Sequence, residues 1–168
     1  MPMMEVDLEI SDGWPAGIEW EELTDQAIRA TVQTTPELAI SRLSVSILFA
    51  GDEVLQTLNR EWRGKDRPTN VLSFPMLTRD ELLALGAKGP PVMLGDLALS
   101  HDTCAREAGE KGIALVDHAS HLIVHGLLHL AGYDHETGDE NADEMERLEI
   151  NTLALMGIAN PYGGSEEL

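Results

Sequence analysis

Histidine is concentrated in one short stretch of this 168-residue chain, because five of its six histidines lie between His118 and His135. On a helix that turns 100° per residue, His121 and His129 fall about 40° to either side of His125, and His118 falls about 20° away. The stretch therefore predicts a helix that carries four imidazoles on one narrow face.

The later histidines of this stretch have the spacing of metal ligands. His125 and His129 are four residues apart, so their imidazoles lie one turn apart and can bind one cation. Gly132 favours a helix end that turns the chain back, and His135 can then supply a third ligand. Three neutral imidazoles with an open fourth position are typical of a catalytic zinc site. We therefore predict one divalent metal, Zn²⁺, held by His125, His129 and His135.

The segment HGLLHLAGYDH also has the spacing of the metzincin zinc proteases, H-E-x-x-H-x-x-G-x-x-H. Position 126 is Gly where those proteases carry the Glu that acts as general base, and glycine has no side chain to accept a proton. A metallopeptidase is therefore the weaker interpretation. The pattern favours hydrogen bonding or pocket lining for His118 and His121. Asp134 either orients a ligand or belongs to a turn.

A second group of chemically useful residues is the basic cluster Arg60, Arg63, Lys65 and Arg67, which holds four of the eleven Lys and Arg residues. Such residues near the end of a helix can simply favour its dipole. The next segment, PTNVLSF, is a turn that leads into an apolar strand, which would hold the cluster beside a rigid sheet. Because a guanidinium matches phosphate through paired hydrogen bonds, the cluster predicts a phosphate contact.

Composition limits the classes of function. The chain is 43% hydrophobic, which suits one domain over residues 1–168. Its 11 basic and 30 acidic residues give a net charge of −19, which disfavours coating a membrane or a nucleic-acid duplex. A single Cys104 excludes an intramolecular disulfide framework and a four-cysteine zinc site. No apolar run approaches the roughly 20 residues of a membrane span, and the N-terminus lacks a signal-peptide pattern, so we expect a cytoplasmic protein.

The elements that must position these residues follow from hydrophobic periodicity. Alternation predicts strands over 6–10, 43–49, 70–74 and 92–100. Helical spacing predicts helices over 20–31, 52–62, 102–109, 115–131 and 139–156, with one short helix around 80–85. The tail from Asn160 offers little to bury, so we expect it to fray. The fold class is therefore α+β, a single domain in which an approximately four-stranded mixed sheet packs with helices and the metal site lies on the histidine-bearing helix.

Three segments, LNREWRGKDRPTNVLSFP, LGDLALS and HLIVHGLLHLAGYDH, precede an acidic helix that contains EMERLE. In this order they closely resemble the bacterial YbeY family of metal-dependent endoribonucleases, from about Leu43 to Tyr162. Asn70 stands where many relatives carry Asp, and Asn is an accepted variant there.

The resemblance implies a zinc-type metal on His125, His129 and His135, and an arginine, Arg63, that RNA cleavage requires. It also implies action on single-stranded RNA in ribosomal RNA processing, particularly at the 3′ end of 16S rRNA, and in ribosome quality control. The expected partners are single-stranded RNA, ribosomal RNA, and the small ribosomal subunit or its assembly factors. A non-catalytic assembly factor is the alternative, with a structural metal closed by a fourth ligand such as His121.

Overall fold

A mixed four-stranded sheet organises the protein. The computed structural model describes residues 4–134 and 138–162. The strands are β1 (Glu5–Ile10), β2 (Leu43–Ala50), β3 (Val71–Pro75) and β4 (Val92–Ser100), in the order β1-β2-β4-β3. β1, β2 and β4 run parallel, and β3 pairs antiparallel with β4 at the edge. The predicted α+β class and four-stranded mixed sheet are confirmed.

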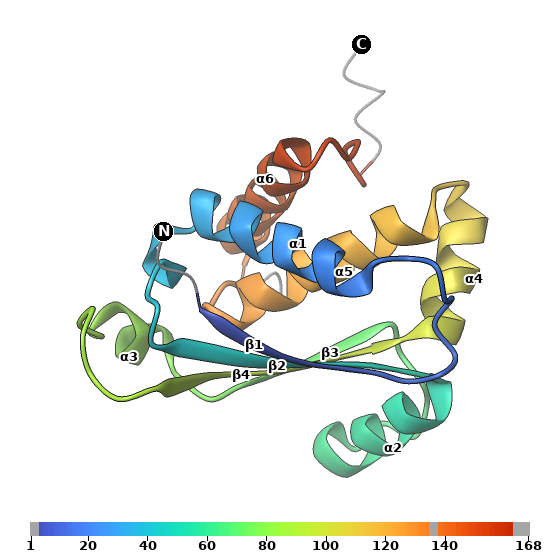
Figure 1. Ribbon diagram of the computed structural model, residues 1–168, viewed down its shortest axis with the longest axis horizontal. Helices are drawn as coiled ribbons and strands as arrows, with labels where there is room; N and C mark the ends of the chain where they lie inside the picture. Colours follow the sequence, from blue (N-terminus) through green and yellow to red (C-terminus); the bar gives the residue numbers. More distant parts are fainter. Residues whose placement is uncertain (1–3, 135–137, 163–168) are drawn as a thin grey trace.

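The helices are distributed unequally over the two faces of the sheet. They are α1 (Trp20–Thr34), α2 (Asp52–Arg63), α3 (Arg79–Leu83), α4 (His101–Lys111), α5 (Leu115–Leu130) and α6 (Asp139–Leu155). α1, α5 and α6 lie over one face, whereas α2 lies against the other (Figure 1). We call these the helical face and the open face. All the predicted strands and helices are present, with their ends shifted by a few residues. Among the residues that the structure describes, the single 3₁₀ turn Pro36–Leu38 is the one element that was not predicted.

The histidine-bearing helix α5 is the central helix of the domain. It contacts α1, α4, α6 and the strands β3 and β4. Apolar side chains cover most of its circumference, which is typical of a helix surrounded by other elements. Ile123, Leu127 and Leu128 of α5 are fully buried. The histidines of α5 are therefore held by a rigid helix rather than by a loop.

The connection between β3 and β4 is fastened to the core. Its helix α3 begins with a capping box, in which the Thr78 hydroxyl accepts a hydrogen bond from the Glu81 backbone N–H and the Glu81 carboxylate accepts one from that of Thr78. Leu82 packs into the core with 1% of its surface exposed. Gly95 of β4 lies so close to β3 that an added Cβ would sit 2.6 Å from the carbonyl oxygen of Phe74. These contacts hold β3 against β4 and hold the following helix α3 against the core.

Taken singly, none of the described helices is both long and apolar enough to span a membrane, although α4 and α5 together meet that criterion as a pair bent by 116°.

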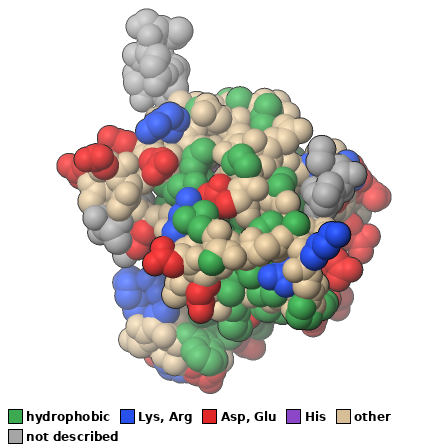
Figure 2. Space-filling model, turned by 90° about the vertical axis from the view of Figure 1, so that its left-hand side faces the viewer, with side chains coloured by type: hydrophobic (Ala, Val, Ile, Leu, Met, Phe, Trp, Pro, Cys, Tyr) green, Lys and Arg blue, Asp and Glu red, His purple; other side chains and the backbone are tan. Residues whose placement is uncertain are grey.

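On the end of the molecule that carries α3, acidic, basic and hydrophobic side chains are interspersed, and no histidine of the described residues is visible (Figure 2).

Candidate functional site

A cavity of about 510 Å³ lies beside α5, against the edge strand β3. We call it the histidine cavity. It brings together residues that the sequence analysis singled out from separate segments: Arg63, His118, His121, His125, His129 and Asp134 all line it. Arg63 comes from the end of α2, the histidines come from α5, and Asp134 follows α5. Of the basic cluster, Arg63 thus shares a cavity with the histidines beside the edge strand of the sheet.

The four histidines of α5 form a continuous row, as their spacing predicts. The ring centroids of His118 and His121 are 6.1 Å apart, and those of His121 and His125 are 6.3 Å apart. His125 and His129 are closer, with 4.7 Å between their centroids. The closest pair is thus the pair that the sequence assigned to the metal.

Glu149 of α6 lies directly behind this pair. Its Oε2 is hydrogen-bonded to Nδ1 of His125, and only 1% of its surface is exposed. Burial raises the pKa of Glu149, but the nearby His121 and the hydrogen bonds from His125 and Tyr162 outweigh that effect, and the pKa is about 2. A buried carboxylate therefore stays ionised and holds the His125 ring by one nitrogen.

Tyr162 closes the same group of residues from the C-terminal segment. Its hydroxyl donates a hydrogen bond to Oε1 of Glu149 and lies 3.5 Å from Nε2 of His121. Burial and the hydrogen bond to Glu149 raise the pKa of Tyr162. Fraying was expected from about residue 160, yet Tyr162 lines the histidine cavity. Residues 163–168 lie outside the described residues.

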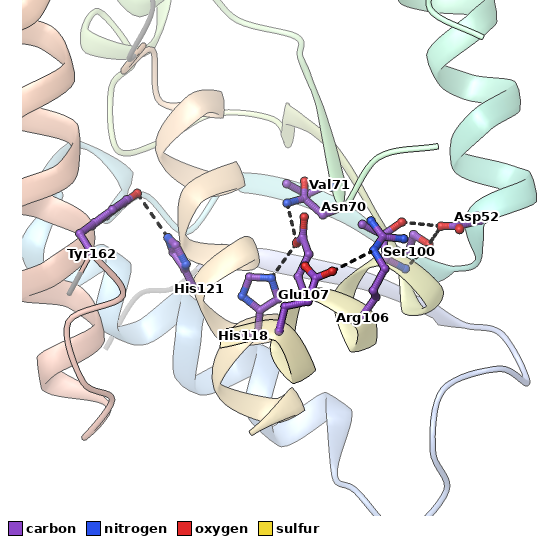
Figure 3. Close-up of polar contacts among 11 residues, drawn as sticks. Asp52, Asn70, Val71, Ser100, Arg106, Glu107, His118, His121 and Tyr162 are labelled. Atoms are coloured by element: carbon purple, nitrogen blue, oxygen red, sulfur yellow. Dashed lines mark hydrogen bonds and ion pairs between the residues drawn. The ribbon is translucent and has the colours of Figure 1, made fainter. Parts of the chain in front are cut away.

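A second, half-buried carboxylate orients the other end of the histidine row. Oε1 of Glu107, on α4, is 2.8 Å from Nε2 of His118 and 3.0 Å from Nδ2 of Asn70 (Figure 3). Burial lowers the pKa of His118, so its neutral ring donates the Nε2 proton to Glu107. His118 thus ties α5 to α4 and to the start of β3, which agrees with its predicted role in hydrogen bonding and pocket lining.

Among the four basic cluster residues, Arg63 alone lines the histidine cavity. It is the last residue of α2, which ends at Gly64 in the left-handed conformation with φ 70°. Nη1 of Arg63 lies 3.4 Å from Oδ1 of the buried Asn59, whose Nδ2 also donates to the carbonyl oxygen of Arg67. Arg60 instead pairs with Asp66 at 3.4 Å between Nη1 and Oδ1. The helix end therefore directs one guanidinium at the histidines.

Packing against the sheet explains why a glycine occupies position 126 of α5. A Cβ at this position would lie 2.6 Å from Cδ2 of Leu97, a core residue of β4 that is 2% exposed. A side chain at this position would require Leu97 to move, so the close packing of α5 on the sheet favours glycine where metzincins carry a glutamate. This geometry argues against the peptidase interpretation.

The third predicted ligand, His135, lies outside the described residues. Within the part of the chain that the structure describes, no three His, Cys, Asp or Glu side chains are arranged as a metal site. The ligand set His125, His129 and His135 therefore stays a prediction, supported by the placement of the first two residues.

Sequence reasoning missed three residues of the site, Glu107, Glu149 and Tyr162. A signal for Glu149 was present, because it lies on the face of α6 that also carries the buried residues Met145, Thr152 and Leu153. An acid within such a stripe indicates a buried partner. Tyr162 carried no periodic signal, since it follows the last helix.

Comparisons with known proteins agree with the fold and the motifs. A family model described as Endoribonuclease YbeY matches residues 14–157. The chain is 61% identical over 160 residues to Endoribonuclease YbeY of Erythrobacter litoralis, covering 95% of this chain and 98% of that protein. It is 53% identical over 162 residues to Endoribonuclease YbeY of Novosphingobium aromaticivorans, covering 96% of each.

The fold also resembles the solution structure of a Thermotoga maritima protein, with a TM-score of 0.57 over 88% of this chain and 86% of that chain. The two sequences are 23% identical, so this likeness supports the fold alone. The family model and the relatives match nearly the whole chain, including the segments around Arg63 and the histidines. The chain therefore belongs to the YbeY family.

Proposed function

We propose that this chain is a metal-dependent endoribonuclease that cuts single-stranded RNA in ribosomal RNA processing, with the 3′ end of 16S rRNA as its main target, and that serves ribosome quality control in the cytoplasm. Its family membership and the names of its relatives support RNA cleavage. The observation that carries the proposal is that Arg63 and the pair His125 and His129 line one cavity.

The donor set suits a divalent metal such as Zn²⁺, which His125, His129 and His135 would hold. Glu149 accepts a hydrogen bond from Nδ1 of His125, so Nε2 is the nitrogen that would face a cation. This arrangement fixes the tautomer and the ring orientation in advance. When bound, the metal would activate a water molecule or polarise a phosphate oxygen near neutral pH.

Arg63 supplies the complementary function for a phosphodiester. Its guanidinium can donate two parallel hydrogen bonds to phosphate oxygens. It lines the cavity from the end of α2, where its Nη1 lies 3.4 Å from Oδ1 of Asn59. We assign Arg63 the stabilisation of the negative charge that develops on the phosphate during cleavage.

Glu149 does not serve as the proton acceptor. It is buried, ionised with a pKa of about 2, and engaged by His125 and Tyr162. Both of its carboxylate oxygens are already hydrogen-bonded to these partners, so neither is placed to take a proton from a nucleophile in the cavity. Glu149 is therefore a positioning residue, and the identity of the cleavage products will show whether water or the RNA 2′-hydroxyl attacks the phosphate.

Two rival functions are less well supported by the geometry. A structural metal closed by His121 conflicts with the contacts of Nε2 of His121, which lies 3.5 Å from the Tyr162 hydroxyl and 3.7 Å from Oε1 of Glu149. A metallopeptidase lacks its general base, because position 126 is a glycine that packs against Leu97. One experiment distinguishes both of these functions from the proposed one.

Metal-loaded protein is incubated with a single-stranded RNA, a duplex RNA of the same sequence and a peptide library, each with and without chelator. We expect cleavage of the single strand only, lost with chelator. Products ending in a 2′,3′-cyclic phosphate would assign the attack to the 2′-hydroxyl. Peptide cleavage would show a metallopeptidase, and intact substrates in every arm would leave the non-catalytic assembly factor.

A further inference from the structure

The three tryptophans of the chain have very different environments. Trp14 and Trp20 are each 4% exposed and pack against Phe49 in the core. Trp62, one residue before Arg63, is 71% exposed. A tryptophan left in water forgoes the burial of a large apolar side chain, so its exposure beside a candidate active site calls for a ligand.

Trp62 borders a second cavity, of about 630 Å³, on the open face of the sheet. We call it the open-face cavity. Phe74 of β3 lies beside Trp62, with ring centroids 6.2 Å apart and an angle of 60° between the rings. Leu58 and the 57% exposed Met76 line the same cavity. The two aromatic rings therefore lie side by side at the border of this cavity, and the indole of Trp62 is largely accessible to solvent.

The two cavities meet at the edge of the sheet. Ser73 and Pro75 of β3 line both of them, and β3 is the edge strand. Trp62 and Arg63 are adjacent in α2, yet the first lines the open-face cavity and the second lines the histidine cavity. A chain molecule that crosses this edge can touch both residues at once.

The charged residues near Trp62 indicate what kind of ligand the two aromatic rings would bind. The basic cluster Arg60, Arg63, Lys65 and Arg67 surrounds the end of α2 that carries Trp62. The acids that line the open-face cavity, Asp7, Glu9 and Asp96, come from β1 and β4 instead. Flat apolar rings next to guanidinium groups match a single-stranded nucleic acid, whose bases stack on aromatic side chains while cations follow its phosphates.

We propose that Trp62, supported by Phe74, is a stacking platform for a nucleobase of the RNA strand whose phosphate reaches Arg63. This inference rests on the proposed endoribonuclease function and adds a binding subsite to it. It gives a physical reason for a single-strand preference, because a base paired within a duplex does not present its face to an indole. The platform binds and aligns RNA and takes no part in the chemistry.

The test separates stacking from general apolar contact. Binding of a fluorescent single-stranded RNA is measured by anisotropy in chelator, so that no cleavage occurs. Trp62→Leu keeps an apolar side chain but removes the aromatic face, and should raise the Kd by roughly 5- to 150-fold, the loss expected for one stacked base. Trp62→Phe should recover most of the affinity. The control Val54→Ala changes another exposed apolar residue of α2, 41% exposed, and should bind like the wild type.

Intrinsic fluorescence gives a second measurement, since Trp14 and Trp20 are buried. RNA should quench the emission of the wild type, and Trp62→Phe should abolish most of that quenching. Equal RNA affinity of Trp62→Leu and the wild type would overturn the proposal and leave the open-face cavity as a protein docking surface. The proposal would also be overturned if size-exclusion chromatography showed that the substitution changes the oligomeric state and that this change causes the loss of affinity. Because binding is measured without turnover, failure of the cleavage proposal would be seen separately.

Discussion

The two cavities on either side of β3 are lined by different kinds of side chain. The histidine cavity rests on buried, mutually bonded ionisable groups, with Glu149 and His118 each 1% exposed. The open-face cavity is lined mostly by apolar side chains, among them the 71% exposed Trp62, with the acids Asp7, Glu9 and Asp96 on its β1 and β4 side. The first arrangement orients groups for chemistry, whereas the second offers surface for binding. Substitutions in the two cavities should therefore affect different measurable quantities.

The largest effect is expected from the histidines. His129→Ala and His125→Ala should each lose the bound metal and with it nearly all RNA cleavage, because removing one of three ligands leaves too few for a stable site. Elemental analysis of the purified variants measures the metal. His101→Asn is a control outside the row, since His101 lies at the start of α4 against Trp14. Full metal occupancy in both alanine variants would refute the ligand set.

Arg63 should affect turnover without affecting the metal. Arg63→Ala is expected to lower the cleavage rate by about 10²-fold or more, the scale of one lost active-site donor, with metal content and melting temperature nearly unchanged. Arg63→Lys should recover only part of the rate, because it keeps the charge but loses the planar fork. The matched control is Arg29→Ala, which removes an exposed arginine of α1 that pairs with Asp25 outside the basic cluster and should leave turnover unchanged. Wild-type turnover in Arg63→Ala would make Arg63 a structural helix-end residue.

Glu149 should tune the affinity for the metal. Glu149→Gln removes the negative charge behind His125 and should weaken Zn²⁺ binding by about 10- to 100-fold. Competition with a chromophoric chelator measures the Kd, which a purely structural role would leave unchanged. Glu146→Gln alters an exposed acid of the same helix and serves as the control. Equal Kd values for Glu149→Gln and the wild type would show that the carboxylate does not support the metal.

The local elements were predictable from sequence because strand alternation and helical spacing are local properties. The segment 43–49 alternates cleanly, and β2 occupies Leu43–Ala50. The row of histidines on α5 was equally predictable, since one helix sets all their positions. The position of the basic cluster before an apolar strand predicted that it lies beside the sheet, whereas the proximity of Arg63 to the histidines was not predicted from the pattern.

The contacts that complete the site were not predictable, because they join residues far apart in the chain. Glu149 meets His125 only when α6 packs on α5, and Tyr162 reaches His121 across 41 residues. Glu107 meets Asn70 only when α4 lies beside the start of β3. Such pairs carry no spacing rule, so periodicity shows at most that one partner lies on a buried face.

The smallest effect concerns pH and Glu107. Burial raises the pKa of Glu107, but hydrogen bonds from His118 and Asn70 outweigh it and hold the pKa below the usual 4.5. The unfolded chain takes up this proton near pH 4.5 and the folded chain only at lower pH, so the stabilisation is present above pH 4.5 and is lost as the pH falls through the folded value.

Glu107→Gln should therefore lower the free energy of unfolding of the metal-free protein by on the order of 1 kcal/mol at pH 7. The difference from the wild type should shrink as the pH falls below 4.5. Urea unfolding at a series of pH values measures it. Asp7→Asn, an exposed acid of the open face, should change stability by less than about 0.5 kcal/mol. A difference between Glu107→Gln and the wild type that is independent of pH would contradict this account.

The central claim is that the histidine cavity cuts RNA with the help of a metal, and reconstitution of the wild-type chain tests it most directly. Cleavage of one single-stranded RNA is measured in the purified protein, after removal of its metal by chelator, and after stepwise return of Zn²⁺. The account predicts that activity disappears on removal and returns in proportion to occupancy, saturating at about one ion per chain. Undiminished cleavage by the metal-free protein would contradict it.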